Sequence, residues 1–262
     1  MNPGQIHLLV TLLKSLKLPT LVRNYEAFAR EARESGAAYE DYLLRLVEEE
    51  GHQRKANQLQ KRLRNASFPQ MKTLEDAELT RWPGLEAMSL RAYAEGDYIK
   101  ARENLIFLGK HGTGKTHLAI ALGIEACRKG YRVSFTTAAS LVNRLVEARD
   151  EKQLENMLKR LRRVELLIVD ELGYIPFSRE GGQLLFQVIS DRYEMGSMIL
   201  TSNLAFSEWD QVFRDANLTA ALLDRLTHHS QIHQFAWESI RFQESMKKRK
   251  GAKNQKILRG TP

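Results

Sequence analysis

The sequence predicts an α/β fold, in which a parallel sheet is flanked by helices and preceded by a small all-helical domain. Three observations lead to this prediction. Apolar, strand-like runs alternate with helical runs from Tyr98 onward, a pattern typical of a parallel sheet covered by helices. A glycine-rich loop joins the first of these strand-like runs to the helical run that follows it. Residues 1–66 show only helical spacing of their apolar side chains.

The N-terminal 66 residues divide into predicted helices. Leucines recur at helical spacing over residues 8–16, and Pro19 interrupts that run. A second helix fits residues 21–35. A third fits residues 39–63, where apolar side chains in a highly charged background indicate an amphipathic helix with an exposed face. We expect this domain to contact a partner protein or DNA.

Two further segments lie outside the predicted sheet domain, which we bound at residues 98–246. Residues 67–97 contain Pro83 and Gly84 and lose the apolar periodicity, so they predict a linker or a clasp onto the sheet domain. Residues 247–262 are basic and poor in apolar side chains, which predicts a mobile tail.

Within the sheet domain, the pattern predicts five strands and a set of intervening helices. The strands are Asn104–Gly109, 132–136, 166–170, 198–201 and 232–235. The helical runs are Lys115–Lys129, 139–163 with a break near Asp150, 182–195 and 218–229.

The glycine-rich loop reads Gly-Lys-His-Gly-Thr-Gly-Lys-Thr over residues 109–116. Its glycines allow a tight turn in which successive N–H groups point at one anion, and the following helix N-terminus adds partial positive charge. This is the context of a phosphate-binding loop. Lys115 is then predicted to reach the β- and γ-phosphates and Thr116 to hold Mg²⁺. We assign ATP binding to Gly109, Gly112, Thr113, Gly114, Lys115, Thr116 and His117.

A phosphate-binding loop by itself is shared by kinases, GTPases and motor-like ATPases, and residues 166–171 narrow the choice. Four apolar residues predict a buried central strand, which brings Asp170 to the carboxyl end of the sheet, where ligands bind. Asp170 is expected to coordinate Mg²⁺, and Glu171 to orient and polarise the attacking water. Alternatively, Glu171 is only an acidic residue at the N-terminus of the next helix, without a catalytic role.

Three more polar residues are candidates for sensing the γ-phosphate. Asn203 follows the next strand, where its amide could bond the γ-phosphate or the attacking water; the alternative is that Thr201, Ser202 and Asn203 cap the following turn. Arg225 lies in an apolar helix; it either pairs with the adjacent Asp224 or acts as an arginine finger on a neighbouring subunit. Arg241 is a candidate second phosphate sensor.

The chain is basic, with a formal net charge of +8 and a pI near 9.5. Eight lysines or arginines against one acid occupy the segment from Arg241 to the end, and a second basic cluster occupies residues 159–163. Solvated helix faces explain such runs in many proteins. In a nucleotide-binding protein they favour a nucleic-acid partner.

Several classes are excluded. No apolar stretch approaches the roughly 18 residues of a membrane span, and the first residues lack signal-peptide features, so we expect a cytoplasmic protein without a membrane partner. The single cysteine, Cys127, allows no internal disulfide and is expected to be a buried thiol. His228, His229 and His233 are joined by no cysteine or carboxylate at metal-ligand spacing, so a zinc site is not predicted.

Together these segments resemble the IstB family, the ATP-binding transposition helpers of bacterial insertion sequences. These helpers belong to the AAA+ clade that includes the helicase loader DnaC and the initiator DnaA. The resemblance spans nearly the whole chain. It is carried by residues 109–119, 135–137, 167–174, 185–186, 192–194, 200–203, 208–209 and 221–226. It implies a P-loop AAA+ ATPase that selects or remodels target duplex DNA and stimulates a separate transposase, which itself cleaves the DNA.

Family roles carry over residue by residue. The resemblance implies phosphate and Mg²⁺ binding by Lys115 and Thr116, Mg²⁺ and water roles for Asp170 and Glu171, a sensor role for Asn203 and a finger in trans for Arg225. The ATP sites would then lie at subunit interfaces of a homo-oligomer. A helical insertion over residues 137–163 would face DNA, with contacts from Arg144, Arg149, Lys159 and Arg160.

The sequence departs from the family pattern at two places. Lys110 and His111 stand where prolines are frequent, in positions whose side chains are not phosphate ligands. Trp237 and Ile240 stand where glycine and tyrosine are common, which puts the sensor role of Arg241 in doubt. Two other functions stay open. One is a DnaC-like helicase loader that acts through a protein partner and single-stranded DNA. The other is a small-molecule kinase, which would need an acceptor pocket.

Overall fold

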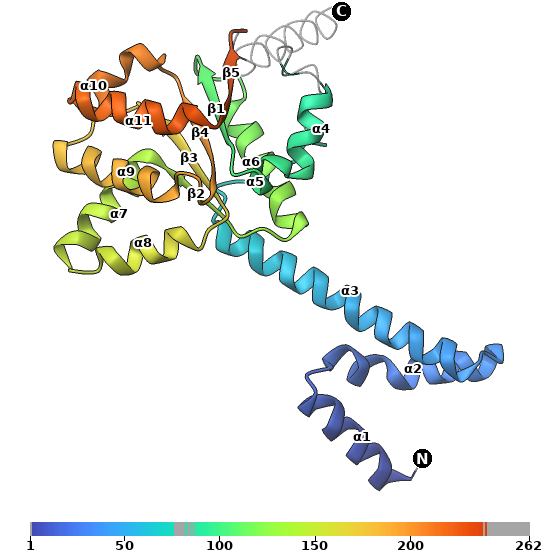
Figure 1. Cartoon of the computed structure of the whole chain (residues 1–262). Helices are drawn as coiled ribbons and strands as arrows, with labels where there is room; N and C mark the ends of the chain where they lie inside the picture. Colours follow the sequence, from blue (N-terminus) through green and yellow to red (C-terminus); the bar gives the residue numbers. More distant parts are fainter. Residues whose placement is uncertain (1, 76–81, 83–84, 86, 238, 240–262) are drawn as a thin grey trace, which may run out of the picture. The chain divides into compact units, whose positions relative to one another are not determined.

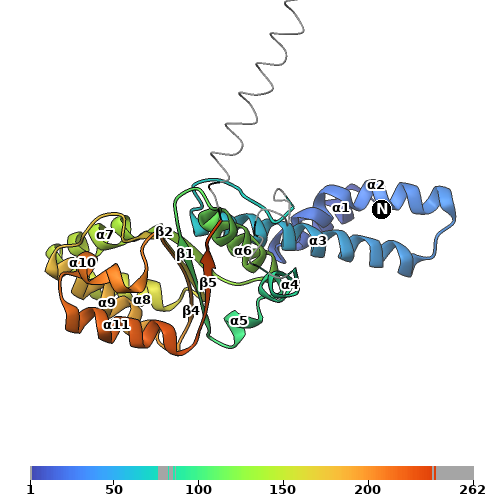
Figure 2. The ribbon, with the colours of Figure 1, turned by 90° about the horizontal axis from the view of Figure 1, so that it is seen from above.

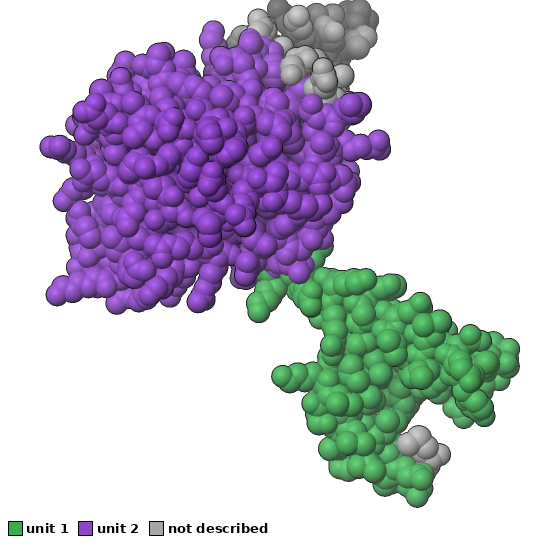
Figure 3. All heavy atoms as spheres, in the orientation of Figure 1, with its two compact units in different colours: residues 1–61 green, residues 62–262 purple. Residues whose placement is uncertain are grey.

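The computed structural model describes residues 2–75, 82, 85, 87–237 and 239 (Figure 1). The chain forms two compact units, Met1–Lys61 and Arg62–Pro262 (Figure 3). The boundary between the units falls within helix α3 (Tyr39–Ala66). The limits 66, 97 and 246 that we expect from the sequence stay predictions.

The first unit is helical, as predicted, and its helix ends follow local sequence signals. Helix α1 (Pro3–Ser15) begins with a capping box, in which the side chain of Asn2 accepts from the N–H of Gln5 at 2.8 Å. Helix α2 (Pro19–Ser35) starts at its proline, because the fixed φ of proline suits the first helical position. It ends at Gly36, whose φ of +65° favours glycine.

A buried carboxylate organises the first unit. Glu50 of α3 accepts from the backbone N–H groups of Thr20 at 2.9 Å and Leu21 at 3.3 Å, so it caps the start of α2. Its other oxygen pairs with Arg54 at 2.8 Å. Burial disfavours the charge of Glu50, but the hydrogen bonds from Arg54 and from the α2 amides outweigh it and lower its pKa.

The apolar side chains of the first unit are largely left uncovered. Helix α1 buries no residue, although leucine is frequent in it. The exposed large apolar side chains of this unit are Leu8, Leu12, Leu16, Tyr39, Leu43, Leu44 and Val47. An apolar surface of this kind is typical of a site that another molecule covers.

The second unit is built on a five-stranded parallel sheet with the order β2-β3-β4-β1-β5. The strands are β1 (Asn104–Gly109), β2 (Val133–Thr137), β3 (Leu166–Leu172), β4 (Ser197–Ser202) and β5 (Ser230–Phe235). Parallel pairing makes the carboxyl ends of β1, β3 and β4 neighbours at one edge, where α/β proteins bind ligands. The predicted fold class is confirmed.

Helices cover both faces of this sheet (Figure 2). One face carries α6 (Lys115–Lys129), on which α4 (Ala87–Glu95) packs. Short α5 (Asp97–Lys100) leads into β1. The opposite face is covered by α7 (Ala138–Asp150), α8 (Leu154–Arg162), α9 (Arg179–Arg192), α10 (Trp209–Phe213) and α11 (Ala216–His228), with the 3₁₀ turn η2 (Phe206–Glu208) before α10.

Most of the predicted elements are present, with shifts at their ends. The predicted break near Asp150 is confirmed: α7 ends there, and Lys152 adopts a left-handed φ of +58° before α8 begins. Helix α4 lies in the segment predicted to be irregular. Its Leu90 and Tyr93 are buried at helical spacing. The helix is not predicted, because it spans only nine residues and follows Pro83 and Gly84 in the sequence. Cys127 is buried as expected, and burial raises the pKa of its thiol to about 11.

One buried arginine ties together the amino-terminal side of the sheet. Arg192, at the end of α9, is 3% exposed. Its guanidinium donates to the carbonyl oxygens of Leu161 at 2.8 Å, Val164 at 3.0 Å, Glu165 at 3.4 Å and Ser197 at 2.8 Å. Burial lowers its pKa to about 10. Arg192 therefore supplies donors to carbonyl groups where α8 ends and where β3 and β4 begin.

We expect Arg192→Met to destabilise the second unit by about 2–4 kcal/mol, because several buried carbonyls lose their donors at once. The exposed side chain of Arg163 makes no hydrogen bond or ion pair within the described residues, and Arg163→Met is the matched control. All three tryptophans, Trp82, Trp209 and Trp237, belong to the second unit. Denaturant unfolding followed by tryptophan fluorescence therefore reports this unit alone. Equal unfolding midpoints for the two variants would contradict the structural role of Arg192.

Candidate nucleotide site

A pocket of about 620 Å³ lies at the carboxyl ends of the central strands. The loop after β1, the ends of β2, β3 and β4, the first turns of α6 and residues of the 69–82 segment line it. The sequence-predicted residues among them are Gly112, Gly114, Lys115, Thr116, His117, Asp170, Glu171 and Asn203. The fold thus gathers most of the predicted site from separate stretches of the chain.

The glycines of the phosphate loop are required by its geometry. Gly109 has a φ of +142°, and a Cβ on it would lie 2.3 Å from the carbonyl oxygen of Phe235 in β5. Gly112 has a φ of +78°, and a Cβ there would lie 2.1 Å from the Ser239 hydroxyl oxygen. Gly114, at φ +97°, is the N-cap of α6. A side chain at Gly109 or Gly112 would therefore collide with Phe235 or Ser239, and a side chain at any of the three positions would strain the backbone.

Two residues assigned to nucleotide binding shape the loop without lining the pocket. Gly109 ends β1. Thr113 is fully buried, and its hydroxyl donates to the carbonyl oxygen of Lys110 at 2.9 Å. The indole N–H of Trp237 donates to the carbonyl oxygen of Thr113 at 3.0 Å. Trp237, which departs from the family pattern, therefore stabilises the phosphate loop through this hydrogen bond.

The ammonium group of Lys115 lies inside the phosphate loop. It donates to the carbonyl oxygens of Gly109 at 2.5 Å and Lys110 at 2.8 Å. The side chain is buried and borders the pocket. A buried cation within this glycine-rich loop is suited to binding phosphate oxygens.

Oxygen ligands meet in the same pocket at Asp170. The hydroxyls of Thr116 and Thr201 donate to the same oxygen of Asp170, at 2.9 and 2.5 Å. Asp170 is 3% exposed, so these hydrogen bonds hold its carboxylate in one position. A buried carboxylate and a hydroxyl are hard oxygen donors of the kind that Mg²⁺ binds together with phosphate. The residues therefore fit the predicted metal.

A β-bulge explains how consecutive residues of one strand line one pocket. Regular strand geometry sends Asp170 and Glu171 to opposite faces. Here Val169 pairs with Leu200 and Leu172 pairs with Ser202, so two residues of β3 oppose one residue of β4. Glu171 adopts a left-handed φ of +58°, and its N–H donates to the Thr201 hydroxyl at 3.0 Å. Its exposed carboxylate lines the pocket beside Asp170.

The turn after β4 bears on the two interpretations of Asn203. Ser202, rather than Asn203, caps this turn, since its hydroxyl accepts from the N–H of Leu204 at 3.1 Å. The Asn203 amide makes no hydrogen bond within the described part of the chain and borders the pocket. The predicted cap by residues 201–203 is therefore made by Ser202, and contact of the Asn203 amide with the γ-phosphate or the attacking water stays a prediction.

One wall of the pocket comes from the segment that the sequence suggested only as a linker or clasp. Pro69, Gln70, Lys72 and Trp82 line it. His117 joins this wall to α6, because its Nε2 bonds the carbonyl oxygen of Thr73 at 3.2 Å and its ring meets Trp82 edge-on at 5.7 Å. No local pattern distinguishes these four residues as site residues. Their role follows from tertiary packing.

Arg225 lies outside the pocket. Its guanidinium donates to the Ser190 hydroxyl at 3.0 Å and sits 4.6 Å from the ring centroid of Phe186, both in α9. It forms no ion pair with Asp224 in the described structure, so the alternative of a structural pair is wrong. Arg241 lies outside the described residues, as does the basic tail 247–262.

The four candidate DNA contacts lie on α7 and α8. Arg144 is exposed and donates to the Thr136 hydroxyl at 3.0 Å, and Arg160 is exposed. Lys159 lies 3.8 Å from Glu155. Arg149 pairs with Asp150 and Glu180 at 2.8 Å each. Carboxylates therefore neutralise Arg149 most fully, while Arg144 and Arg160 form no ion pair among the described residues.

The histidines noted in the sequence separate into two environments. His233 of β5 bonds the Tyr93 hydroxyl at 2.8 Å, and burial lowers its pKa. His228 and His229 lie beside Glu194 at the surface. The sequence spacing around these histidines does not reveal Glu194, because the fold brings this carboxylate to His228 and His229 from a distant turn.

The sheet order, the phosphate loop after β1 and the polar residues at the carboxyl ends of β3 and β4 define a P-loop ATP-binding protein of the AAA+ class. The chain resembles AMPPCP-bound DnaA from Aquifex aeolicus with a TM-score of 0.51 at 23% identity, over 64% of this chain and only 50% of that chain. It resembles DnaI with a TM-score of 0.52 at 17% identity, over 62% and 90% of the two chains. At these identities the likeness shows the fold alone.

The chain belongs to the family of IstB-like ATP binding proteins, whose sequence model matches residues 11–248. It is 38% identical to an ATP-binding protein of insertion sequence IS21 from Pseudomonas aeruginosa, over 92% of this chain and 91% of that one. It is also 38% identical to the corresponding protein of insertion sequence IS5376 from Geobacillus stearothermophilus, over 92% and 96%. The predicted family resemblance is confirmed. No helix within the described residues has the length and apolarity of a membrane span.

Proposed function

We propose that the protein is an ATPase that assembles on target duplex DNA and stimulates the transposase of an insertion sequence. The single observation that carries this proposal is the bulge in β3, which brings Asp170 and Glu171 together at one pocket with Lys115 and Thr116. The phosphate loop alone would be enough for a site that binds nucleotide without hydrolysing it. A second carboxylate beside the buried one is suited to hydrolysis.

Each residue of the pocket has a role in this proposal. The loop N–H groups and Lys115 bind the phosphates. Thr116 and Asp170 hold Mg²⁺, which when bound neutralises developing charge on the phosphate oxygens. Glu171 orients the attacking water and accepts its proton, while Asn203 positions the γ-phosphate or the water. The products are ADP and phosphate.

The position of Arg225 supports a site completed by a neighbouring subunit. Its guanidinium contacts α9 of its own chain and does not line the pocket. An arginine finger supplied in trans must lie at the surface of its own subunit. Arg225 is half-buried rather than fully buried, so its guanidinium can reach a neighbouring subunit from the surface of its own. We therefore infer a homo-oligomer in which ATP fixes the spacing between subunits.

Duplex DNA and a transposase are the partners that we infer. The relatives are encoded by insertion sequences, and the net charge of +8 suits a polyanion. Arg144, Lys159 and Arg160 on α7 and α8 are exposed and are the proposed phosphate contacts, with Arg149 less available because of its ion pairs. The helical first unit, with its uncovered leucines, is the proposed contact for the transposase. Such a protein acts in the cytoplasm.

DNA binding across a salt series tests this function. We expect tight duplex binding with ATP, weaker binding with ADP or without nucleotide, and a steep loss of affinity with salt, because each neutralised phosphate adds about −0.9 to the log–log slope. Arg144→Ala combined with Lys159→Ala should make the slope shallower by about 0.9 per lost contact. The control is Arg91→Ala combined with Lys129→Ala, which removes the same charge from α4 and α6.

Equal affinity with all nucleotide states would remove the proposed coupling between ATP and DNA. An equal change of slope in both double variants would exclude α7 and α8 as the DNA-contacting elements. A preference for single-stranded over duplex DNA would instead favour the helicase-loader alternative.

A further inference from the structure

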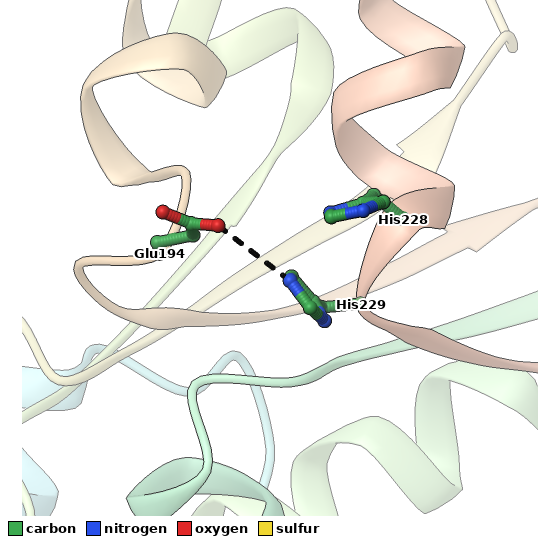
Figure 4. Close-up of side chains that lie close together, drawn as sticks. All are labelled: Glu194, His228 and His229. Carbon is green, nitrogen blue, oxygen red and sulfur yellow. Dashed lines mark ion pairs between the residues drawn. The ribbon is translucent and has the colours of Figure 1, made fainter.

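Three potential metal ligands meet on the surface of the second unit. Glu194 lies in the turn between α9 and β4, His228 is the last residue of α11, and His229 precedes β5. Each offers one ligand atom, and these atoms all lie within 4.8 Å of one another. The carboxylate oxygen of Glu194 and Nε2 of His229 are 3.6 Å apart, and both face the same space (Figure 4).

The backbone and a neighbouring hydroxyl hold this group of side chains. Glu194 adopts a left-handed φ of +57°, and its carbonyl oxygen accepts from Arg102 at 2.7 Å. The Tyr193 hydroxyl bonds Nδ1 of His228 at 2.7 Å, which leaves Nε2 of that ring for another partner. Metal-binding histidines commonly engage an oxygen through their other ring nitrogen in this way, which fixes the orientation of the ring.

We propose that Glu194, His228 and His229 bind one divalent transition-metal ion of the Zn²⁺ type. Two imidazoles and a carboxylate form a ligand set that zinc accepts, and water completes its tetrahedron. Metal–ligand bonds of roughly 2.0–2.1 Å place tetrahedral ligand atoms about 3.3–3.5 Å apart. The 3.6 Å pair is close to this separation. The ligand atom of His228 lies within 4.8 Å of those of Glu194 and His229, and Tyr193 is the residue that positions its ring.

This site is separate from the nucleotide pocket. Glu194 precedes the start of β4 and His229 precedes the start of β5, so the ligands lie at the amino ends of the strands. The nucleotide pocket lies at their carboxyl ends. A bound ion would tie the α9–β4 turn to the junction of α11 and β5. Metal binding should therefore stabilise the second unit.

Zinc binding to the full chain, prepared without a histidine tag or nucleotide, tests this site. We expect one zinc ion per chain by isothermal titration and a rise of the thermal midpoint followed by tryptophan fluorescence. Glu194→Gln combined with His229→Gln should weaken binding at least about tenfold and abolish the rise. His52→Gln is the control, because His52 is an exposed histidine on α3, outside the second unit.

Tyr193→Phe should weaken zinc binding less than the double variant while leaving the stoichiometry unchanged, because it removes a positioning hydroxyl and no ligand. Equal zinc affinity for the wild type and the double variant would overturn the proposal, whether that affinity is tight or negligible. A loss of binding in His52→Gln as large as in the double variant would overturn it as well.

Discussion

Glu171→Gln will bind ATP with nearly unchanged affinity and hydrolyse it roughly 10²–10⁴-fold more slowly. Glutamine keeps the size of the side chain and the backbone bulge, but its amide cannot accept a proton from water. The phosphate ligands Lys115 and Thr116 are untouched, so ATP binding has no reason to fall. Single-turnover hydrolysis and equilibrium ATP binding on the same preparation separate the two steps.

Glu147→Gln is the control for this substitution, because Glu147 is an exposed acid on α7 that does not line the pocket. It should hydrolyse ATP at the wild-type rate. Normal hydrolysis by Glu171→Gln would show that another group activates water. A parallel loss of ATP binding would show that Glu171 acts on the structure of the pocket.

Lys115→Ala will bind ATP roughly 10- to 100-fold more weakly than the wild type, because charge-assisted hydrogen bonds to the phosphates are lost. The same change removes the ammonium that now bonds the carbonyls of Gly109 and Lys110. Fluorescence titration with an ATP analogue measures the affinity, and the thermal midpoint without nucleotide reports any loosening of the loop.

Lys110→Ala is the matched control, since it removes an exposed lysine from the same loop. It should keep ATP affinity within a few fold. If the two variants bound ATP equally well, the phosphate contact would belong to another cation. Lys72, which lines the pocket from the 69–82 segment, is then the residue to replace.

The phosphate loop and the strands were predictable because their signals are local. Gly109, Gly112 and Gly114 each stand at a backbone conformation that favours glycine, and the apolar run before Asp170 forms a fully buried strand. The position of Asp170 followed from the rule that ligands bind at the carboxyl ends of parallel strands. Such residues can be recognised from the sequence, because local backbone conformation and strand burial limit which residue types fit there.

The remaining features depend on pairing and packing between distant segments. The bulge at Glu171 arises from its register against β4 and from the Thr201 hydroxyl, which no pattern within β3 records. Trp82 enters the pocket wall through its contact with His117, although neighbouring Pro83 and Gly84 suggest only a linker. Glu194 reaches the histidines because two strand beginnings lie on the same side of the sheet.

The surroundings of Arg225 could not be predicted for the same reason. Asp224 is its neighbour in sequence, but successive residues of a helix point in different directions. The contacts of Arg225 are instead with Ser190 and Phe186 of α9. The sequence therefore left a finger and a structural ion pair as open alternatives.

A high-resolution structure of ATP-bound Glu171→Gln protein on duplex DNA would show whether neighbouring subunits complete the ATP site. We predict an oligomer in which ATP phosphates lie against the loop and Lys115, with the neighbouring subunit's Arg225 at the γ-phosphate. We also predict that Arg225 has left Ser190. ATP-bound monomers, or an oligomer in which every Arg225 still contacts Ser190 of its own chain, would contradict a role for Arg225 in trans.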